Sequence, residues 1–277
     1  MNFLSRARPY VLHLRPQSFP VAFLAALTGY ALSPARARGW ALGADLSLLF
    51  GLYGVLLWGG TNAYNSGQDG DTGPLNMLPN PPPVPPHLAA FGLVVKGLAM
   101  AGAALVSLRL GALFLTAAVA SVFYSARSAQ MPRWARGKDI PGLDMAINAG
   151  GFGLGSLLVG YCLTPAPLTA TVWLYGAGFT LAYWGGMPTT QLFQMVPTDT
   201  AATVPNYTAA LSGHRVLRLA SGFFAAHVLV LAALDLPRLG AASAVTPFAQ
   251  PYAKMMRQMT AMMSSQLCWT LYAWLSW

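Results

Sequence analysis

Oxygen-bearing side chains cluster between residues 62 and 71, where the sequence reads NAYNSGQDGD. On a helix, Asn62, Asn65 and Asp69 are spaced i, i+3 and i+7 and share one face. Carboxylate and amide oxygens suit a hard cation such as Mg²⁺, which proteins usually hold through one or two carboxylates together with substrate phosphates. A helix that ends in a Gly/Asp turn would give the same pattern without any ligand, so the spacing leaves both interpretations open.

Two further groups of polar residues could join such a site. Asp144 and Asn148 form an i, i+4 pair where an apolar stretch begins, and Gln194 shortly precedes Asp199. A carboxylate in the first turn of a helix can also cap that helix or interact favourably with its dipole. Asp199 can also be an ordinary loop residue. A ligand role and a local structural role are therefore both open for these residues.

Basic side chains accompany the acids along the chain. Arginine can bind phosphate oxygens through two parallel hydrogen bonds, and lysine acts as a point charge. Carboxylates and basic residues on one face could therefore hold Mg²⁺ and a diphosphate together, although basic residues can also serve only to orient membrane helices. The basic residues in question are Arg127, Arg133, Arg136, Lys138, Arg215 and Arg218.

The elements that carry these residues are predicted to be membrane-spanning helices. Only 8% of the 277 residues are charged, whereas about 25% of the residues in a soluble domain are charged. So few charges cannot cover a soluble protein of this length, and a bilayer crossing takes about 20 mostly apolar residues in helical form. We predict an all-α, multi-pass transmembrane bundle of about eight helices, or nine. The approximate spans are 18–33, 43–65, 88–108, 111–126, 143–163, 167–189, 216–234 and 252–277.

The net charge of +9 does not indicate nucleic-acid binding, because the basic residues lie singly or in short groups between the apolar stretches. If the N-terminus is cytoplasmic, nine basic residues fall in cytoplasmic segments and four, among them Arg36 and Arg38, fall on the other side. The positive-inside rule favours this orientation. Five of the seven acids, all of them aspartates, fall on the same side. The polar residues are therefore predicted to face the cytoplasm.

Lys96 lies well inside the predicted span 88–108. A charge inside a membrane is costly and suggests a function by default, but a lysine can also extend its ammonium group towards the interface. Both interpretations are open. The two cysteines, Cys162 and Cys268, lie in apolar stretches without a CxxC spacing and are predicted to be packing residues.

The segment from Asn65 to Leu75, followed by the proline-rich stretch from Asn80 to Pro85, resembles a signature of bacterial UbiA-family membrane proteins. Further matches follow in the same order, and the resemblance covers roughly residues 15–215. These matches are Arg15-Pro16 before the first span, Tyr124-Ser125 at the end of the fourth, Pro141 to Asp144 with Asn148 and Gly151 at the fifth, and Gln194 and Asp199 near the family's second Asp-rich region.

The resemblance implies one transmembrane prenyltransferase domain over residues 1–277, in the inner membrane of a bacterium, with its site facing the cytoplasm. Family members transfer a prenyl group from an allylic diphosphate to an aromatic or other lipophilic acceptor, and two Asp-rich regions bind the Mg²⁺ that holds the diphosphate. Carried over by position, Asn65, Asp69 and Asp199 would be catalytic and metal-binding, with Asp71 as a further ligand. The implied substrate contacts are Tyr124, Arg127, Lys138, Asp144, Asn148 and Gln194.

The acidic motifs are thinner than the family's usual pattern. Ser66 stands where the second residue of an Asn-Asp pair is usual, and Gly73 and Thr203 stand where later aspartates are usual. The basic residue usual near the end of the second region is also missing. Two alternatives to a prenyltransferase therefore stay open. One is a terpene cyclase that uses the same diphosphate site, and the other is a UbiA-like membrane subunit without catalysis.

Overall fold

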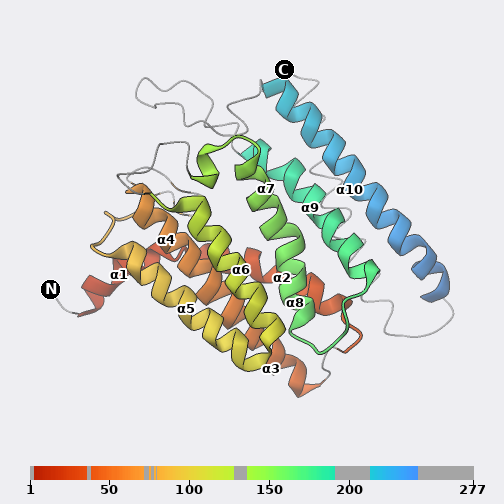
Figure 1. Cartoon of the computed structure of the whole chain (residues 1–277), viewed down its shortest axis with the longest axis horizontal. Coiled ribbons are helices and arrows are strands. Elements are labelled where there is room, and N and C mark those ends of the chain that lie inside the picture. Colours follow the sequence, from red (N-terminus) through yellow and green to blue (C-terminus); the bar gives the residue numbers. More distant parts are fainter. Residues whose placement is uncertain are drawn as a thin grey trace. The chain divides into compact units, whose positions relative to one another are not determined.

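In the computed structural model, every element of regular secondary structure among the described residues is a helix. The chain forms two compact units, one of residues 1–138 with 155–168 and the other of residues 139–154 with 169–277. Figure 1 labels the helices of both units. The residues that the structure describes are 3–35, 39–71, 75, 78, 80–127, 136–190 and 213–242.

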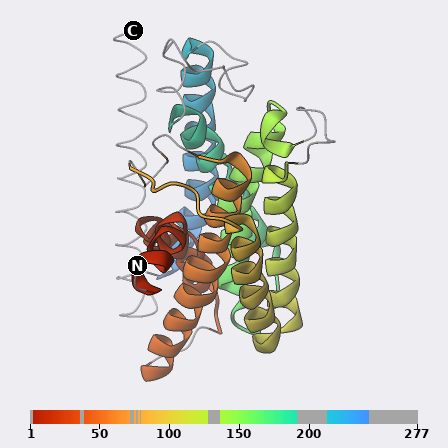
Figure 2. The ribbon, with the colours of Figure 1, turned by 90° about the vertical axis from the view of Figure 1, so that its left-hand side faces the viewer.

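Most helices of the first unit follow one another closely along the chain. The helical segments α3, η2 and α4 run on without a break from Trp40 to Asp69, and η2 is a stretch of wider π-helical turns. Helices α5 and α6 are joined at Ser107 and pack side by side, as Figure 1 and Figure 2 show. The elements are α1 (Phe3–His13), η1 (Pro16–Ser18), α2 (Phe19–Leu32), α3 (Trp40–Leu49), η2 (Phe50–Trp58), α4 (Gly59–Asp69), α5 (Leu88–Val106), α6 (Leu108–Ser125) and α8 (Ser156–Cys162).

Glycines let the backbones of α2 and α8 approach very closely. A Cβ atom on Gly29 of α2 would lie 1.8 Å from the carbonyl oxygen of Leu157, and one on Gly160 of α8 would lie 1.7 Å from that of Ala26. Small residues are favoured where membrane helices meet, because lipid is as apolar as a leucine side chain and helix association depends on close packing. The sequence of both helices therefore specifies this crossing.

The polar end of α4 is set by a glycine. Gly70 has a φ of 65°, in the left-handed region, and its N–H donates to the carbonyl oxygen of Ser66 at 3.0 Å. A left-handed glycine is a common way to end a helix. It leaves Asp69 as the last helical residue, with Asp71 just beyond, and the helical spacing predicted from Asn62 onward is confirmed.

In the second unit, α9 packs against both α7 and α10. A Cβ atom on Gly153 would lie 2.4 Å from Cα of Thr180, so the π-helical stretch η5 contacts α9 closely. The rings of Phe152 and Tyr183 stack with their centroids 5.3 Å apart. The elements are α7 (Leu143–Gly150), η5 (Gly151–Gly155), α9 (Ala170–Thr190) and α10 (Gly213–Ala242).

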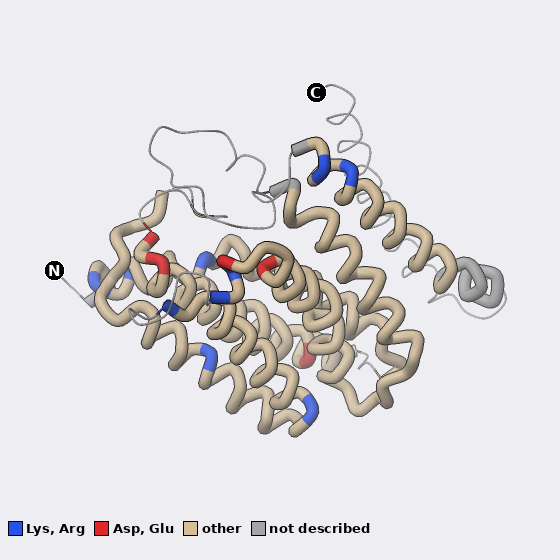
Figure 3. The backbone as a smooth tube through the Cα atoms, turned by 45° about the horizontal axis from the view of Figure 1, so that its top comes forward, with Lys and Arg blue, Asp and Glu red and all other residues tan. Residues whose placement is uncertain are grey.

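Five helices within the described residues are long and apolar enough to cross a membrane, namely Trp40–Asp69, Leu88–Val106, Leu108–Ser125, Leu143–Cys162 and His214–Leu234. The predicted spans 18–33 and 167–189 correspond to α2, which has 14 residues, and α9. The predicted span 252–277 lies outside the described residues. Most of the backbone in Figure 3 carries no charged residue. The protein is therefore an all-α integral membrane protein, as predicted.

Candidate functional site

Asn62 ties α4 to the corner between α1 and α2. Its side-chain nitrogen donates to the carbonyl oxygen of Leu14 at 3.2 Å and to Oγ of Ser18 at 3.1 Å. The indole nitrogen of Trp58, one turn earlier on the same continuous helix, donates to the same Ser18 oxygen at 2.7 Å. The two N–H donors of Asn62 are thus used in structural contacts, and this residue anchors the helix that also carries Asn65, Gln68 and Asp69.

The next polar residues of α4 contact the end of α6. Oδ1 of Asn65 accepts a hydrogen bond from the Ser125 hydroxyl at 2.8 Å. Oε1 of Gln68 accepts one from the backbone N–H of Arg127 at 2.7 Å. Two contacts between residues about sixty positions apart therefore fix the last turns of both helices to each other, and the Arg127 side chain is left exposed.

Asp69 lies between two basic side chains. Nη1 of Arg136 donates to its Oδ1 at 2.9 Å, and Nζ of Lys138 donates to its Oδ2. All three side chains are largely buried, with exposed fractions of 8% for Arg136 and 16% for Asp69 and Lys138. Burial lowers the pKa of Lys138, and the attraction of Asp69 opposes that shift. Hydrogen bonds between ionised partners are shorter and stronger than neutral ones, so these contacts hold the turn Gly137–Asp139 at the end of α4.

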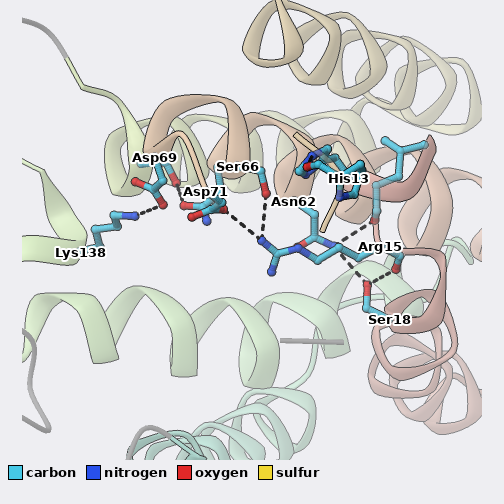
Figure 4. A network of polar contacts seen from close by, with 12 residues as sticks. His13, Arg15, Ser18, Asn62, Ser66, Asp69, Asp71 and Lys138 are labelled. Carbon is cyan, nitrogen blue, oxygen red and sulfur yellow. Dashed lines mark hydrogen bonds and ion pairs between the residues drawn. The ribbon is translucent and has the colours of Figure 1, made fainter. Parts of the chain in front are cut away.

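Asp71 and Arg15 form a second, looser pair beside the first (Figure 4). Nη2 of Arg15 donates to Oγ of Ser66 at 3.0 Å and lies 3.8 Å from Oδ2 of Asp71. Burial raises the pKa of Asp71, and repulsion from Asp69 adds to that shift, while Ser66 and Arg15 oppose it. The end of α4 therefore holds two carboxylates whose mutual repulsion is offset by basic residues from distant parts of the chain.

The polar residues at the end of α4 and their partners form one cluster, which consists of His13, Arg15, Ser66, Asp69, Asp71, Arg136 and Lys138 (Figure 4). Three of its buried polar atoms have no hydrogen-bond partner among the described residues. They are Nδ1 of His13, Nε of Arg15 and Oδ2 of Asp71. A buried polar atom without a partner costs roughly 1–3 kcal/mol. The cluster therefore has hydrogen-bonding capacity left for a polar ligand, which its hydrogen bonds within the protein do not use.

The donor set fits a hard divalent cation that also binds a phosphate. Asp69 and Asp71 supply two carboxylates, which suits Mg²⁺ when substrate phosphates and water complete its coordination. The described residues contain no group of three or more His, Cys, Asp or Glu side chains placed to hold a metal ion. The described part of the cluster therefore suits a cation shared with an anionic ligand better than one enclosed by protein alone.

The other predicted site residues lie in various places. In the second unit, the carboxylate of Asp144 accepts a hydrogen bond from the N–H of Gly142 at 2.9 Å, and Asn148 donates to the Asp144 carbonyl oxygen at 2.9 Å. These contacts agree with the local structural role that the sequence left open for both residues. Tyr124 lies in the last turn of α6. Gln194 and Asp199 lie outside the described residues.

Several residues of the cluster received no specific role from the sequence. Arg15 stood out only as part of an Arg-Pro pair before the first span, and Arg136 only as one basic residue among several. Ser125 stood out only as part of the Tyr124-Ser125 pair at the end of the fourth span, and nothing in the local sequence distinguished His13. The available signal for Arg136 was its position two residues before Lys138, because both precede an apolar stretch at the same membrane face.

Comparisons with known proteins bear on the fold. No family model and no curated protein matches the chain. Solved structures of a UbiA homolog from Archaeoglobus fulgidus do match, at 16% sequence identity and over 96% of this chain. The structure bound to GPP and Mg²⁺ has a TM-score of 0.66 over 86% of its own chain. The structure bound to DMAPP and Mg²⁺ has a TM-score of 0.63 over 85%, and the one bound to Cd²⁺ has 0.64 over 87%.

These likenesses extend over nearly the whole of both chains, so they concern the complete helical arrangement and not one hairpin. They agree with the all-α, multi-pass fold predicted from the sequence. This chain has the fold of the UbiA homologues.

Proposed function

We propose that this protein is a Mg²⁺-dependent membrane prenyltransferase, which moves a prenyl group from an allylic prenyl diphosphate to an aromatic or other lipophilic acceptor. The observation that carries the proposal is the buried cluster at the end of α4, where Asp69 and Asp71 meet Arg15, Arg136 and Lys138. Similar folds bound to GPP or DMAPP with Mg²⁺ support it.

In this proposal, the carboxylates and the basic residues of the cluster have separate roles. Asp69 and Asp71 would hold the cation, with Asn65 and, by the family resemblance, Asp199 as further ligands. Lys138, with Arg136 and Arg15, would bind the diphosphate oxygens, because ammonium and guanidinium groups that pair with a carboxylate can equally pair with a phosphate. Bound Mg²⁺ would act as a Lewis acid that stabilises the negative charge of the leaving diphosphate.

In this proposal, the protein also stabilises the charges that develop during prenyl transfer. Basic residues that are already positioned can stabilise the charge that develops on the diphosphate as its bond to the prenyl carbon breaks. The allylic cation that results can be stabilised by aromatic faces. The proposed substrate contacts also include Tyr124, Arg127, Asp144, Asn148 and Gln194.

The proposal also covers domain organisation and location. We infer a single membrane domain over residues 1–277 that lies in the inner membrane of a bacterium, with the α4 cluster at the cytoplasmic face. The excess of basic residues on that side supports the orientation. Lipid is then both the surrounding solvent and the source of a lipophilic acceptor.

The test is Mg²⁺-dependent release of pyrophosphate from prenyl diphosphates of several lengths by the detergent-purified protein, with and without a pool of aromatic acceptors. We expect acceptor-dependent release that is lost in Asp69→Asn. The matched control is Asp45→Asn, which makes the same change at an aspartate away from the cluster. Asp45 lies on α3 and accepts a hydrogen bond from the Tyr30 hydroxyl at 2.7 Å. Release without acceptor would indicate a cyclase. No release from a folded protein would indicate a non-catalytic subunit.

A further inference from the structure

Lys96 is a lysine inside a membrane span whose side chain is almost completely buried within the protein. It lies in α5, and 1% of its surface is exposed. Its ammonium group therefore does not extend to the membrane interface, which was one of the two interpretations open from the sequence. The other interpretation is that Lys96 has a functional role, and the residues that its side chain contacts indicate what that role is.

The Lys96 side chain lies between α4 and α6. Its Nζ donates to Oγ of Ser121 on α6 at 2.9 Å and lies 4.1 Å from the ring centroid of Tyr64 on α4. Two glycines make room for it at the α4–α5 crossing. A Cβ atom on Gly60 would lie 2.8 Å from Cγ of Lys96, and one on Gly92 would lie 2.5 Å from the Tyr64 nitrogen. One lysine on α5 thus contacts both neighbouring helices.

Stability alone does not account for this lysine. A charged side chain within a bilayer is costly, and the ion pairs among the described residues do not involve Lys96. A hydroxyl and an aromatic face compensate such a charge only in part. An apolar side chain of similar length often gives equal or greater stability at a buried charged position.

Both contacts of Lys96 lie next to the Asn65–Ser125 hydrogen bond. Ser121 precedes Ser125 by one helical turn on the same face of α6, and Tyr64 directly precedes Asn65 on α4. The Ser125 hydroxyl occupies one lone pair of the Asn65 amide oxygen, and an amide oxygen has a second one for another partner. The direction of the Asn65 amide oxygen therefore depends on how α4 is rotated about its axis and shifted along it relative to α6.

We propose that Lys96 is a positioning residue, which holds α4 and α6 in register so that the Asn65 amide oxygen faces the cation of the bound Mg²⁺–diphosphate. This inference rests on the proposed function for the meaning of the Asn65 position. The other part of the inference, that Lys96 braces α4 against α6, does not depend on the proposed function and can be measured separately.

The test is a double-mutant cycle of Lys96→Met and Ser125→Ala, with two measurements on each purified variant. One is the midpoint of thermal unfolding without ligand, and the other is the dissociation constant of GPP with Mg²⁺ by calorimetry. We expect Lys96→Met to bind GPP about 10- to 100-fold more weakly, the range seen when the partner of a metal ligand is removed, while its unfolding midpoint does not fall. The double variant should bind as weakly as either single variant, and the midpoints should be non-additive.

The matched control is Arg109→Met, which also removes a long basic side chain from a membrane helix. Arg109 donates to the carbonyl oxygens of Thr164 at 2.7 Å and Ala166 at 2.8 Å, at the opposite end of α6 from Ser125. This variant should lower the unfolding midpoint and leave GPP affinity unchanged. An equal loss of affinity in Arg109→Met and Lys96→Met would overturn the inference, since the loss would then reflect general loosening of the helices.

The two proposals can fail separately. If the wild-type protein binds no GPP, the proposed function is wrong, and the unfolding cycle alone decides whether Lys96 braces α4 against α6. If the midpoints of the cycle are additive, the bracing is wrong, whatever the protein binds. If GPP binds to Lys96→Met as tightly as to the wild type, Lys96 does not position the site.

Discussion

Asp69 is held on both carboxylate oxygens by basic side chains, from Arg136 on one and Lys138 on the other. A carboxylate that is already neutralised in this way is a poor ligand for a cation on its own. It becomes a good one when an anion arrives to take over the basic partners. We therefore expect cation and diphosphate to bind to this end of α4 together and not one after the other independently.

The first prediction concerns Lys138→Met. Removing the ammonium group should weaken the binding of GPP with Mg²⁺ by about 10- to 100-fold, because a hydrogen bond to a charged group contributes roughly 1.5–3 kcal/mol. Calorimetry on the purified variant measures this. Arg8→Gln, which removes an exposed basic residue of α1, is the control and should bind as the wild type does. Equal losses in both variants would mean that overall charge, and not the cluster, attracts the diphosphate.

The second prediction concerns His13, which is fully buried and whose Nε2 lies 3.1 Å from the carbonyl oxygen of Pro82. Burial lowers the pKa of His13 below its ordinary value of 6.5. The unfolded chain therefore takes up a proton at a higher pH than the folded one. The stability that the neutral imidazole provides is fully present above pH 6.5 and is lost as the pH falls through 6.5 towards the lower folded pKa.

The measurement is the midpoint of thermal unfolding between about pH 7.5 and pH 5. The midpoint of the wild type should fall across this range, and that of His13→Gln should fall less, because glutamine can still donate to Pro82 but does not titrate there. His214→Gln, at an exposed position of α10, should retain the wild-type slope. If His13→Gln keeps the full slope, other groups cause it.

Among the described elements, the long apolar helices were predictable from the sequence and the contacts between them were not. The predicted span 88–108 is a helix from Leu88 to Val106, because hydropathy marks it directly. The predicted end of the second span at Asn65 was too early, since α4 continues to Asp69 through polar residues that lower the hydropathy. The π-helical stretch η2 has no such signal in the sequence.

The candidate site illustrates the same limit. The spacing of Asn62, Asn65 and Asp69 was visible in the sequence, because an i, i+3, i+7 pattern is local. The partners of these residues come from far along the chain. Arg15 bonds to Ser66 across 51 positions and Arg136 to Asp69 across 67. Only the packing of α1, α4 and the turn before α7 brings them together, and no local pattern encodes that packing.

The third prediction concerns the α2–α8 crossing. Gly29→Ala and Gly160→Ala should each lower the unfolding midpoint strongly, because their new Cβ atoms would meet the backbone oxygens of Leu157 and Ala26, which cannot move aside alone. Overpacking typically costs about 1–3 kcal/mol. Gly43→Ala in α3 is the control, since its Cβ would meet nothing within 4 Å and alanine is the better helix former by about 1 kcal/mol. An unchanged midpoint in Gly29→Ala would contradict this crossing.

Considered as a whole molecule, the chain distributes its side chains as lipid requires. Large apolar residues such as Leu105, Leu108 and Leu229 are 70–90% exposed. In water, so much exposed apolar surface would indicate an interface or a tendency to aggregate. In a bilayer it is the favourable outer surface. Several charged side chains of the first unit gather instead where α4 and α6 end, namely Arg15, Asp69, Asp71, Arg127, Arg136 and Lys138.

The last prediction is the orientation in the membrane. Helix α6 has 18 residues, which at 1.5 Å per residue gives about 27 Å, close to the hydrocarbon thickness of a bilayer. The contacts of Arg109 place the Thr164–Ala166 segment at one end of α6, and Arg127 follows the other end. The positive-inside rule puts the Arg127 end in the cytoplasm.

Single cysteines at two exposed positions test this, in a background where Cys162 and Cys268 are replaced by alanine. In intact cells of a bacterial host, a membrane-impermeant maleimide should label Pro165→Cys, whereas Arg127→Cys should react only after the cells are opened. The reverse pattern would keep α6 across the membrane and move the carboxylate cluster to the outer face, away from any cytoplasmic diphosphate. Labelling of both cysteines from the same side would mean that α6 does not cross the membrane. The orientation thus decides whether the carboxylate cluster at the end of α4 can meet a diphosphate substrate from the cytoplasm.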